Sequence, residues 1–146
     1  MDRCSVLYEQ WQMECCGSPF GIGDTVAWPT VKWDSAHNSN WATGFKRLSK
    51  EAIEYCYEAH NSGCEELFQI EGIISKIIAI HSSFEPNPDG SNTNIMVPRI
   101  AASVSHADGL DEDVDGFVLD SYFVVLDNAS IKNRQPPKRF ERSCNK

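Results

Sequence analysis

The sequence predicts a mainly β fold of the α+β class: a small antiparallel barrel or strongly bent sheet, SH3-like or similar, with one inserted amphipathic helix. Three observations support this. Residues 67–84 are rich in isoleucine, whose branched side chain favours extended strands. Shorter segments alternate apolar and polar residues, which is the period of a half-buried strand. Glycine and proline separate these segments. The alternative is an α+β sandwich with the helix on one face.

Two short strands are expected near the N-terminus. Residues 3–8 and residues 25–28 contain β-favouring residues in partial alternation. Between them, residues 17–23 hold three glycines and one proline, so this segment must turn. Pro29 then ends the second strand or places it at a sheet edge, because proline lacks a backbone N–H.

The helix is predicted over residues 45–63, after a polar loop at residues 34–44. Ser49 is expected to cap its N-terminus, and Gly63 is expected to end it. Apolar side chains spaced three and four apart would share one buried face. These residues are Leu48, Ala52, Ile53, Cys56 and Ala59.

The second half of the chain is expected to form a sheet of longer strands. The strand over residues 67–84 should bend at Gly72, because an interior glycine commonly marks a bulge. A long connection at residues 85–94 leads to its partner at 95–105, and residues 117–127 form the last strand.

The length of 146 residues fits one domain. We expect a single globular domain over residues 1–128 and a basic, flexible C-terminal tail over 129–146. The last sixteen residues carry six basic and one acidic side chain, or 6 − 1 = +5, so the remaining 130 residues carry −8 − 5 = −13. An acidic body repels nucleic acid and anionic membranes, except through the tail, and attracts a basic protein partner.

We expect a cytoplasmic protein without a membrane span, because the N-terminus has no apolar export signal and the longest apolar run, residues 73–80, contains Lys76. The six cysteines are then expected to be free thiols. Adjacent Cys15 and Cys16, if they lay on a strand, would point to opposite faces. We therefore expect one of them buried and the other at a turn.

A zinc site is the alternative interpretation of the cysteines. Cys56 and His60 are four residues apart, so both would face the same way on a helix. With Cys64, and with Cys15 or Cys16, they would complete a Cys₃His set for zinc. No other cofactor is suggested by the sequence.

Residues 111–116, DEDVDG, resemble the first half of a calcium-binding EF-hand loop, with Asp111, Asp113 and Asp115 at the ligand positions. The twelfth position, which needs a glutamate, is Tyr122. We therefore expect an acidic surface loop that contributes to partner binding, with weak calcium binding as the alternative.

Aromatic residues crowd the first forty-one positions and would form either a binding patch or the core of the N-terminal half. The candidates for a ligand or partner surface are Trp11, Phe20, Trp28, Trp33 and Trp41.

Residues 11–28, WQMECCGSPFGIGDTVAW, resemble the N-terminal signature of a family of small bacterial proteins known only as a domain of unknown function, of the form WQMxCCGxPFxVGDxVxW. Residues 70–80 are similar to a later strand of such proteins. The resemblance implies a bacterial or phage, intracellular origin, and it assigns no catalytic residues. Physically, the segment fits a buried corner with Trp11, Met13 and one cysteine packed inside.

The sequence contains no G-x-S-x-G, H-E-x-x-H, P-loop or dinucleotide glycine motif, so it names no catalytic residue and favours binding over catalysis. We expect a non-catalytic binding module whose acidic body binds a protein partner, as an inhibitor or immunity-like protein would. One alternative is a small-ligand-binding or sequestering protein with an aromatic N-terminal pocket. Another is a zinc- or thiol-dependent enzyme.

Overall fold

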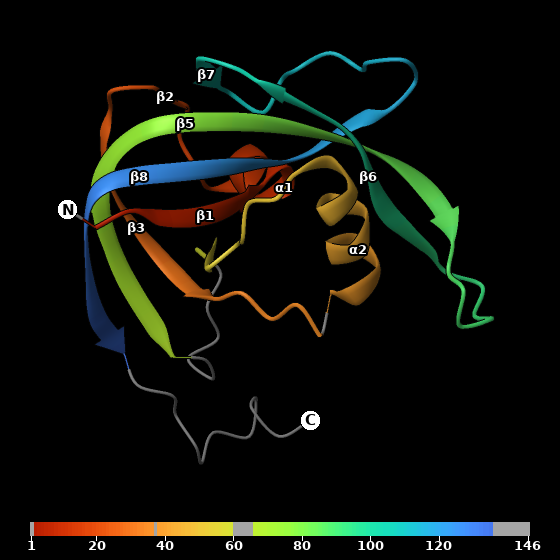
Figure 1. The fold of residues 1–146 in the computed structure, drawn as a ribbon, viewed down its shortest axis with the longest axis horizontal. Helices are drawn as coiled ribbons and strands as arrows, with labels where there is room; N and C mark the ends of the chain where they lie inside the picture. The colour runs from red at the N-terminus through yellow and green to blue at the C-terminus, as the bar shows by residue number, and fades with distance from the viewer. Residues whose placement is uncertain (1, 37, 60–65, 136–146) are drawn as a thin grey trace.

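The computed structural model describes residues 2–36, 38–59 and 66–135, and this part of the chain is mainly β (Figure 1). Its elements, in chain order, are β1 (Cys4–Glu9), α1 (Gln10–Cys15), β2 (Phe20–Gly21), β3 (Thr25–Lys32), α2 (Ser39–Leu48), β4 (Tyr55–Tyr57), β5 (Leu67–Pro86), β6 (Asn94–Ser103), β7 (His106–Ala107) and β8 (Val118–Gln135).

Six strands form one mixed sheet in the order β3-β4-β1-β8-β5-β6. An additional pairing between β3 and β5 brings five of these strands, β3, β4, β1, β8 and β5, into a near-ring. The sixth strand, β6, lies outside the near-ring. The β1–β4 pair is parallel, whereas the other pairs of this sheet are antiparallel. The prediction of a mainly β fold is therefore confirmed, with two short helices instead of one.

The long strand β5 makes the near-ring, because its first part pairs with β3 and its last part with β6, while β8 pairs along most of its length. Its register with β8 shifts between Glu71 and Ile73. A Cβ on Gly72 would lie 3.0 Å from the Asp127 carbonyl oxygen, so glycine allows the two backbones to approach closely here. The bend predicted at Gly72 is confirmed.

The near-ring encloses one hydrophobic core. Strand alternation sends every second side chain of β1 and β8 inward. Tyr8 is fully buried there, and its ring stacks on Tyr57 with the centroids 4.0 Å apart. The buried residues of this inner core are Cys4, Val6, Tyr8, Met13, Phe20, Trp28, Tyr57, Ile70, Ile74, Ile77, Ala79, Ala107, Tyr122, Val124, Leu126 and Ala129.

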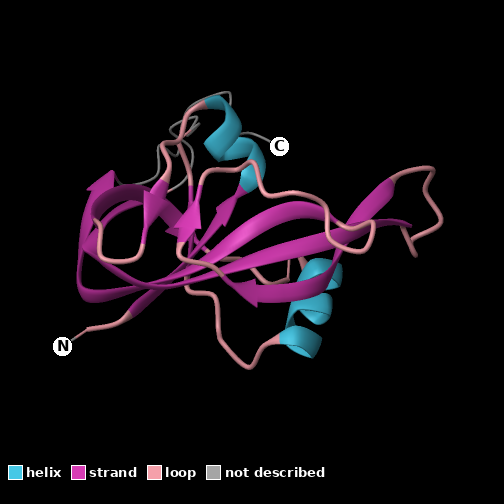
Figure 2. Cartoon of the chain, turned by 90° about the horizontal axis from the view of Figure 1, so that it is seen from above, coloured by secondary structure: helices cyan, strands magenta, loops and turns pink. Residues whose placement is uncertain are grey.

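The intervening side chains of β1 and β8 face a second, smaller core under α2. Its buried residues are Leu7, Phe45, Ile78, Ile80, Phe123 and Val125. Met13 of α1 belongs to the inner core, and Phe45 of α2 belongs to the outer one. The two helices lie on opposite sides of the strands (Figure 2).

The helix predicted over residues 45–63 is wrong in position. The structure has α2 at Ser39–Leu48, and Ser49 is its C-cap, not its N-cap. Residues Tyr55–Tyr57 form β4, which pairs with both β1 and β3. These β-favouring residues gain two strand neighbours, and that tertiary pairing overrides the helical spacing. The polar segment at 34–44 was expected to be a loop, but most of it belongs to α2 or its N-cap.

The expected corner at residues 11–20 is also different in detail. Residues Gln10–Cys15 form α1, and Met13 is buried as predicted. Trp11, however, is 48% exposed, and Cys15 and Cys16 are both exposed. The predicted arrangement of one buried and one exposed cysteine is therefore wrong, because the two cysteines end a helix instead of lying on a strand.

At the other end of the chain, β8 continues through Gln135, beyond residue 129, where the tail was expected to start.

We expect Gly44→Ala to destabilise the fold, although alanine is the better helix former by about 1 kcal/mol. A Cβ at this position would lie 2.8 Å from Cδ of Pro98 and 3.2 Å from Cγ1 of Val97. Pushing α2 away from β6 costs more than the helix gains, so the net loss should be about 1–2 kcal/mol. Urea unfolding measures it. Thr43→Ala, on the exposed side of the same turn, is the control and should change stability by less than about 0.5 kcal/mol. Equal stability of the two variants would contradict the packing argument.

Candidate functional site

An open groove of about 770 Å³ lies where the ends of several strands meet the start of α2. We call it the acidic groove. It is lined by Leu7, Glu9, Val31, Lys32, Trp33, Asp34, Asn38, Ser39, Asn40, Trp41, Cys56, Glu58, Asn87, Ile95, Met96, Asp120 and Ser121.

The alternation of β1 explains why a glutamate stands in this groove. Tyr8 points into the inner core, so Leu7 and Glu9 point to the opposite face. Leu7 is buried under α2, and Glu9, two residues further along the strand, reaches the groove half-buried. Residues 7 and 9 of an alternating strand must share a face, so the sequence itself contains the signal that places Glu9 beside Leu7.

Two tryptophans form the aromatic side of the groove. Trp33 follows β3, and Trp41 lies in the first turn of α2, with their ring centroids 5.6 Å apart. The Trp41 ring also stacks on Phe45, one helical turn away, at 5.4 Å. This stack gives α2 the apolar face that the polar composition of residues 34–44 concealed.

Asp120 is held in place by three donors. The Trp41 indole N–H donates to its Oδ2 atom at 2.5 Å, and the Ser82 hydroxyl donates to the same oxygen at 2.6 Å. The Ser121 hydroxyl donates to Oδ1 at 2.8 Å. Hydrogen bonds of this kind, to an ionised carboxylate, fix its position in advance of any ligand. Sequence reasoning missed Asp120, because Trp41, Ser82 and Asp120 meet only through the pairing of β5 with β8 and the packing of α2.

The groove carries a negative charge. Its lining includes four carboxyl side chains, those of Glu9, Asp34, Glu58 and Asp120, against the single ammonium of Lys32, or −4 + 1 = −3 when all are ionised. Burial raises the pKa of Glu9 above its usual value, and the nearby charges of Asp120 and Glu58 raise it further. Hydrogen bonds from the side chains of Trp11 and Cys56 act in the opposite direction.

Glu58 is positioned from α1 by Gln12, which sequence reasoning also missed. The Gln12 side chain is fully buried. Its amide N–H₂ group donates to the Tyr57 carbonyl at 3.2 Å and to Glu58 Oε1 at 3.1 Å. Its Oε1 atom accepts the Ala59 backbone N–H at 3.1 Å. A buried amide with these three contacts ties α1 to the chain that follows β4.

The structure separates the five aromatic residues predicted to form a binding surface. Phe20 and Trp28 are buried in the inner core, both 5.2 Å from the Tyr8 ring. Trp11 is exposed and does not line the groove. Only Trp33 and Trp41 meet there.

The acidic loop at residues 111–116 does not have the geometry of a calcium loop. Asp111 accepts a hydrogen bond of 2.7 Å from the Tyr122 hydroxyl. Asp115 and Gly116 both have positive φ, 51° and 82°, and Val114 pairs with Phe117 across them. Two central residues with positive φ make a tight two-residue hairpin turn, which Asp-Gly favours. Asp113 is exposed beside this turn.

The predicted zinc ligands are not gathered in the described part of the chain. Cys15 and Cys16 lie at the end of α1, whereas Cys56 lies in β4, where its thiol donates to Glu9 Oε1 at 3.6 Å. His60 and Cys64 fall outside the described residues. Among the residues described, no group of three or more histidine, cysteine, aspartate or glutamate side chains is arranged to hold a metal ion.

The raised pKa of Glu9 predicts that stability falls as the pH rises. The folded chain keeps the Glu9 proton to a higher pH than the unfolded chain does, so the folded state binds more protons in the window that opens near 4.5, the usual glutamate pKa. The free energy of unfolding must therefore decrease with pH through this window and stay lower above it. Glu9→Gln removes this contribution.

Denaturant unfolding of wild type and Glu9→Gln from pH 4 to 8 measures the effect. The variant should gain stability relative to wild type as the pH rises through the window. Glu71→Gln, at an exposed carboxyl of β5 outside the groove, serves as the control and should follow the wild-type curve. A Glu9→Gln curve parallel to wild type would show that Glu9 titrates normally.

Comparison with known proteins adds a family assignment. No helix in the described residues is both long and apolar enough to cross a membrane. Comparison with curated proteins and with solved structures found no match. A family model does match residues 2–128, which include the signature at residues 11–28. The chain belongs to DUF6578, a family of unknown function.

Proposed function

We propose that the chain is a non-catalytic binding module and that its acidic groove receives a positively charged side chain of a basic protein partner. The observation that carries this proposal is the meeting of two tryptophans and four carboxyl groups in one open groove. A cation gains from both at once, because a carboxylate attracts its charge and an aromatic face attracts it through the ring quadrupole.

Arginine fits this arrangement better than lysine does. Its planar guanidinium stacks on aromatic rings and presents several donors to carboxylate oxygens. Trp33 and Trp41 offer ring surface, and Asp34 and Glu58 lie on the same groove lining. Asp120 already accepts hydrogen bonds from Trp41, Ser82 and Ser121, so a ligand that approaches it meets a carboxylate that needs no reorganisation.

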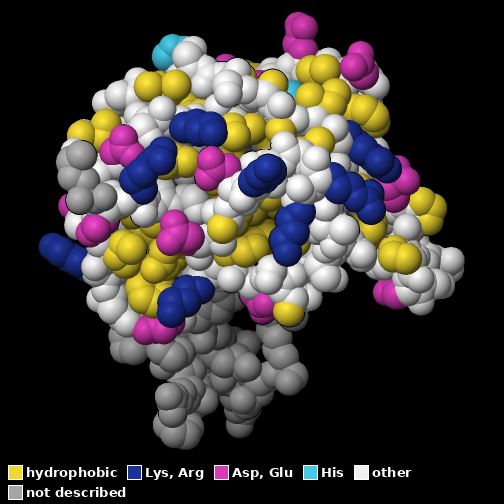
Figure 3. Space-filling model, in the orientation of Figure 1, with side chains coloured by type: hydrophobic (Ala, Val, Ile, Leu, Met, Phe, Trp, Pro, Cys, Tyr) yellow, Lys and Arg dark blue, Asp and Glu magenta, His cyan; other side chains and the backbone are white. Residues whose placement is uncertain are grey.

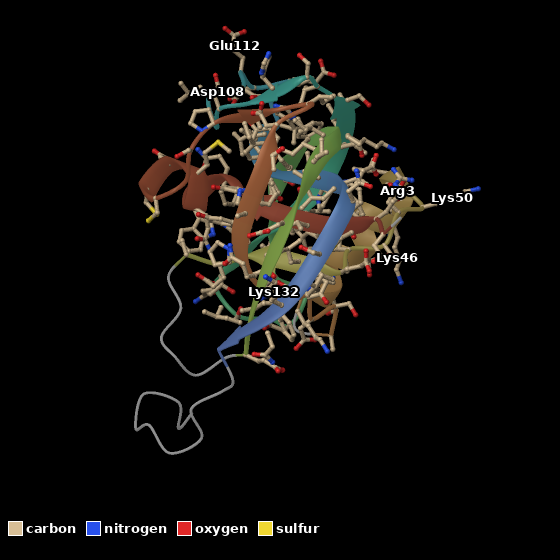
Figure 4. All side chains as sticks on the ribbon, turned by 90° about the vertical axis from the view of Figure 1, so that its left-hand side faces the viewer. Arg3, Lys46, Lys50, Asp108, Glu112 and Lys132 are labelled. Atoms are coloured by element: carbon tan, nitrogen blue, oxygen red, sulfur yellow. The ribbon has the colours of Figure 1, made fainter. Side chains whose placement is uncertain are left out.

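The distribution of charge supports a specific orientation of the partner. Five carboxyl groups and no basic residue occur at positions 108–115, and Asp108 and Glu112 lie at one end of the molecule (Figure 4). Arg3, Lys46 and Lys50 lie on another side in the same view. On the face shown in Figure 3, Lys and Arg side chains are interspersed with Asp and Glu side chains. A basic partner is therefore attracted by the acidic end and repelled by the side that carries Arg3, Lys46 and Lys50.

A small-ligand-binding protein is the second candidate, and the size of the groove favours it. A volume of about 770 Å³ lies within the range of roughly 300–1,000 Å³ that is usual for small-molecule sites. The same tryptophans and carboxylates would then select a cationic aromatic or amine ligand. Native mass spectrometry separates the candidates, because a sequestered small molecule adds mass to the purified chain.

A thiol enzyme has less support. Cys56 lies at the groove, but its side chain is buried, whereas reactive cysteines are usually at least partly exposed. We also propose that the near-ring is a small SH3-like barrel, and the pairing of β3 with β5 supports this. We propose a cytoplasmic location as well. The four cysteines in the described residues, all thiols, support it.

The test uses N-acetyl-arginine amide as a probe of the arginine side chain and the uncharged N-acetyl-citrulline amide as its isostere. We expect the arginine compound to shift the indole N–H signals of Trp33 and Trp41 in NMR spectra, with weak saturable binding. The citrulline compound should shift them much less, because it lacks the charge. Equal shifts from both compounds, or none from either, would overturn the proposal of a cation site.

Matched variants place the binding in the groove. Asp34→Asn with Glu58→Gln removes two groove charges and keeps hydrogen-bond acceptors at both positions. It should weaken binding of the arginine probe by about fivefold, as expected for two partly solvated ion pairs. Glu112→Gln with Asp113→Asn removes the same charge from the acidic loop, outside the groove lining, and should change the affinity by less than about twofold. Equal weakening by both double variants would mean that only net charge matters.

A further inference from the structure

Cys15 and Cys16 stand together at the surface, outside the acidic groove. Their sulfur atoms are 2.7 Å apart, and both side chains are exposed. Cys15 is the last residue of α1, and Cys16 is its C-cap, with φ −143° and ψ −12°. On a strand the two thiols would diverge, but the change of backbone conformation at the helix end turns them toward each other.

The backbone around the pair is firmly held. The N–H groups of Cys16 and Gly17 both donate to the Gln12 carbonyl at 2.9 Å. A Cβ on Gly17 would lie 1.9 Å from the Tyr8 hydroxyl oxygen, so glycine alone lets the chain pass this close to the inner core. The buried Gln12 side chain anchors α1 itself. The two thiols are therefore presented on an ordered turn, which favours their reaction with each other.

We propose that Cys15 and Cys16 form an oxidation site that a peroxide converts reversibly into a vicinal disulfide. One of the two thiols, as its thiolate, attacks one oxygen of hydrogen peroxide, the O–O bond breaks, and the leaving hydroxide takes a proton to become water. That cysteine is then a sulfenic acid. The sulfur of the other cysteine attacks the sulfenic sulfur, the S–S bond forms, the S–O bond breaks, and the proton of the second thiol leaves with hydroxide as a second water. Two thiols and one peroxide thus give one disulfide and two waters.

The exposure of the pair at the surface distinguishes it from the other cysteines. The side-chain hydrogen bond between the two thiols raises the pKa of Cys15 to about 11. The other two cysteines in the described residues are less accessible. Cys4 and Cys56 are both buried, and burial raises the pKa of Cys4 to about 12.

The product is expected to be easily reduced. Adjacent Cα atoms lie about 3.8 Å apart, closer than the roughly 4.4–6.8 Å usual for disulfides. Strain of this kind raises the reduction potential, and labile disulfides are characteristic of regulatory sites and not of structural ones. The pair is therefore suited to repeated oxidation and reduction.

The test treats the reduced full-length chain with a small excess of hydrogen peroxide and then blocks remaining thiols with iodoacetamide. Cleavage after Glu14 and Glu51 releases a peptide whose only cysteines are Cys15 and Cys16. We expect this peptide to escape alkylation and to lose two hydrogen atoms in mass. Dithiothreitol should restore two alkylatable thiols. Unfolding the chain in urea beforehand should slow the reaction, because the ordered turn is lost.

Two variants complete the test. Cys64→Ser with Cys144→Ser should leave the reaction of the pair unchanged, because neither residue takes part in it. Cys16→Ser should abolish the internal disulfide and leave Cys15 alkylatable. The proposal is overturned if the peptide keeps two alkylatable thiols while other cysteines are oxidised. It is equally overturned if Cys15 or Cys16 is found joined to Cys64 or Cys144 instead.

Discussion

The constraint on which the rest of the structure depends is the bending of β5. A straight strand of 20 residues could not pair with β3 at one end and β6 at the other while β8 runs alongside it. Register shifts along the β5–β8 pairing, one of them at Gly72, bend β5. The bend brings strands β3, β4, β1, β8 and β5 into a near-ring. The near-ring gives the sheet an enclosed face and an outer face, and both faces are hydrophobic in part.

This second hydrophobic face explains where the groove lies. A sheet with one buried face needs only polar residues on the other. Here Leu7 and Phe123 are also buried on the outer face, so α2 must cover them. The helix is only ten residues long, and it covers the outer face of the sheet only as far as Trp41. The next outward side chain of β1, Glu9, therefore lies beyond the helix, and the groove is the part of the outer face that α2 leaves open.

The sequence predicted most of the strands because their signals are local. The isoleucine-rich run of β5 and the alternation of β1 are each visible within about ten residues, and the structure confirms both. The sequence did not predict the position of α2 correctly, because Cys56 fits a helical spacing and a strand pairing equally well. Residues 55–57 form a strand because they pair with β1 and β3, and these partners are remote in the sequence.

The candidate sites were harder to predict for the same physical reason. Trp33 and Trp41 were among the predicted aromatic residues, but so were Phe20 and Trp28, which the inner core buries. No local pattern distinguishes the two pairs. Asp120 and Gln12 are single polar residues in ordinary surroundings, and their roles depend on hydrogen bonds to residues 38 to 79 positions away. The adjacent cysteines are plain in the sequence, but the predicted arrangement of one buried and one exposed thiol was wrong. The direction of the two side chains depends on whether residues 10–15 are helical, which the sequence did not predict.

The hydrogen bonds of Gln12 also connect the groove with the cysteine pair. The buried Gln12 side chain donates to the Tyr57 carbonyl and to Glu58 Oε1, and it accepts the Ala59 backbone N–H. The Gln12 backbone carbonyl accepts the N–H groups of Cys16 and Gly17. Breaking such contacts without replacement is costly. One residue of α1 therefore holds both the turn that presents the two thiols and a carboxylate of the groove lining.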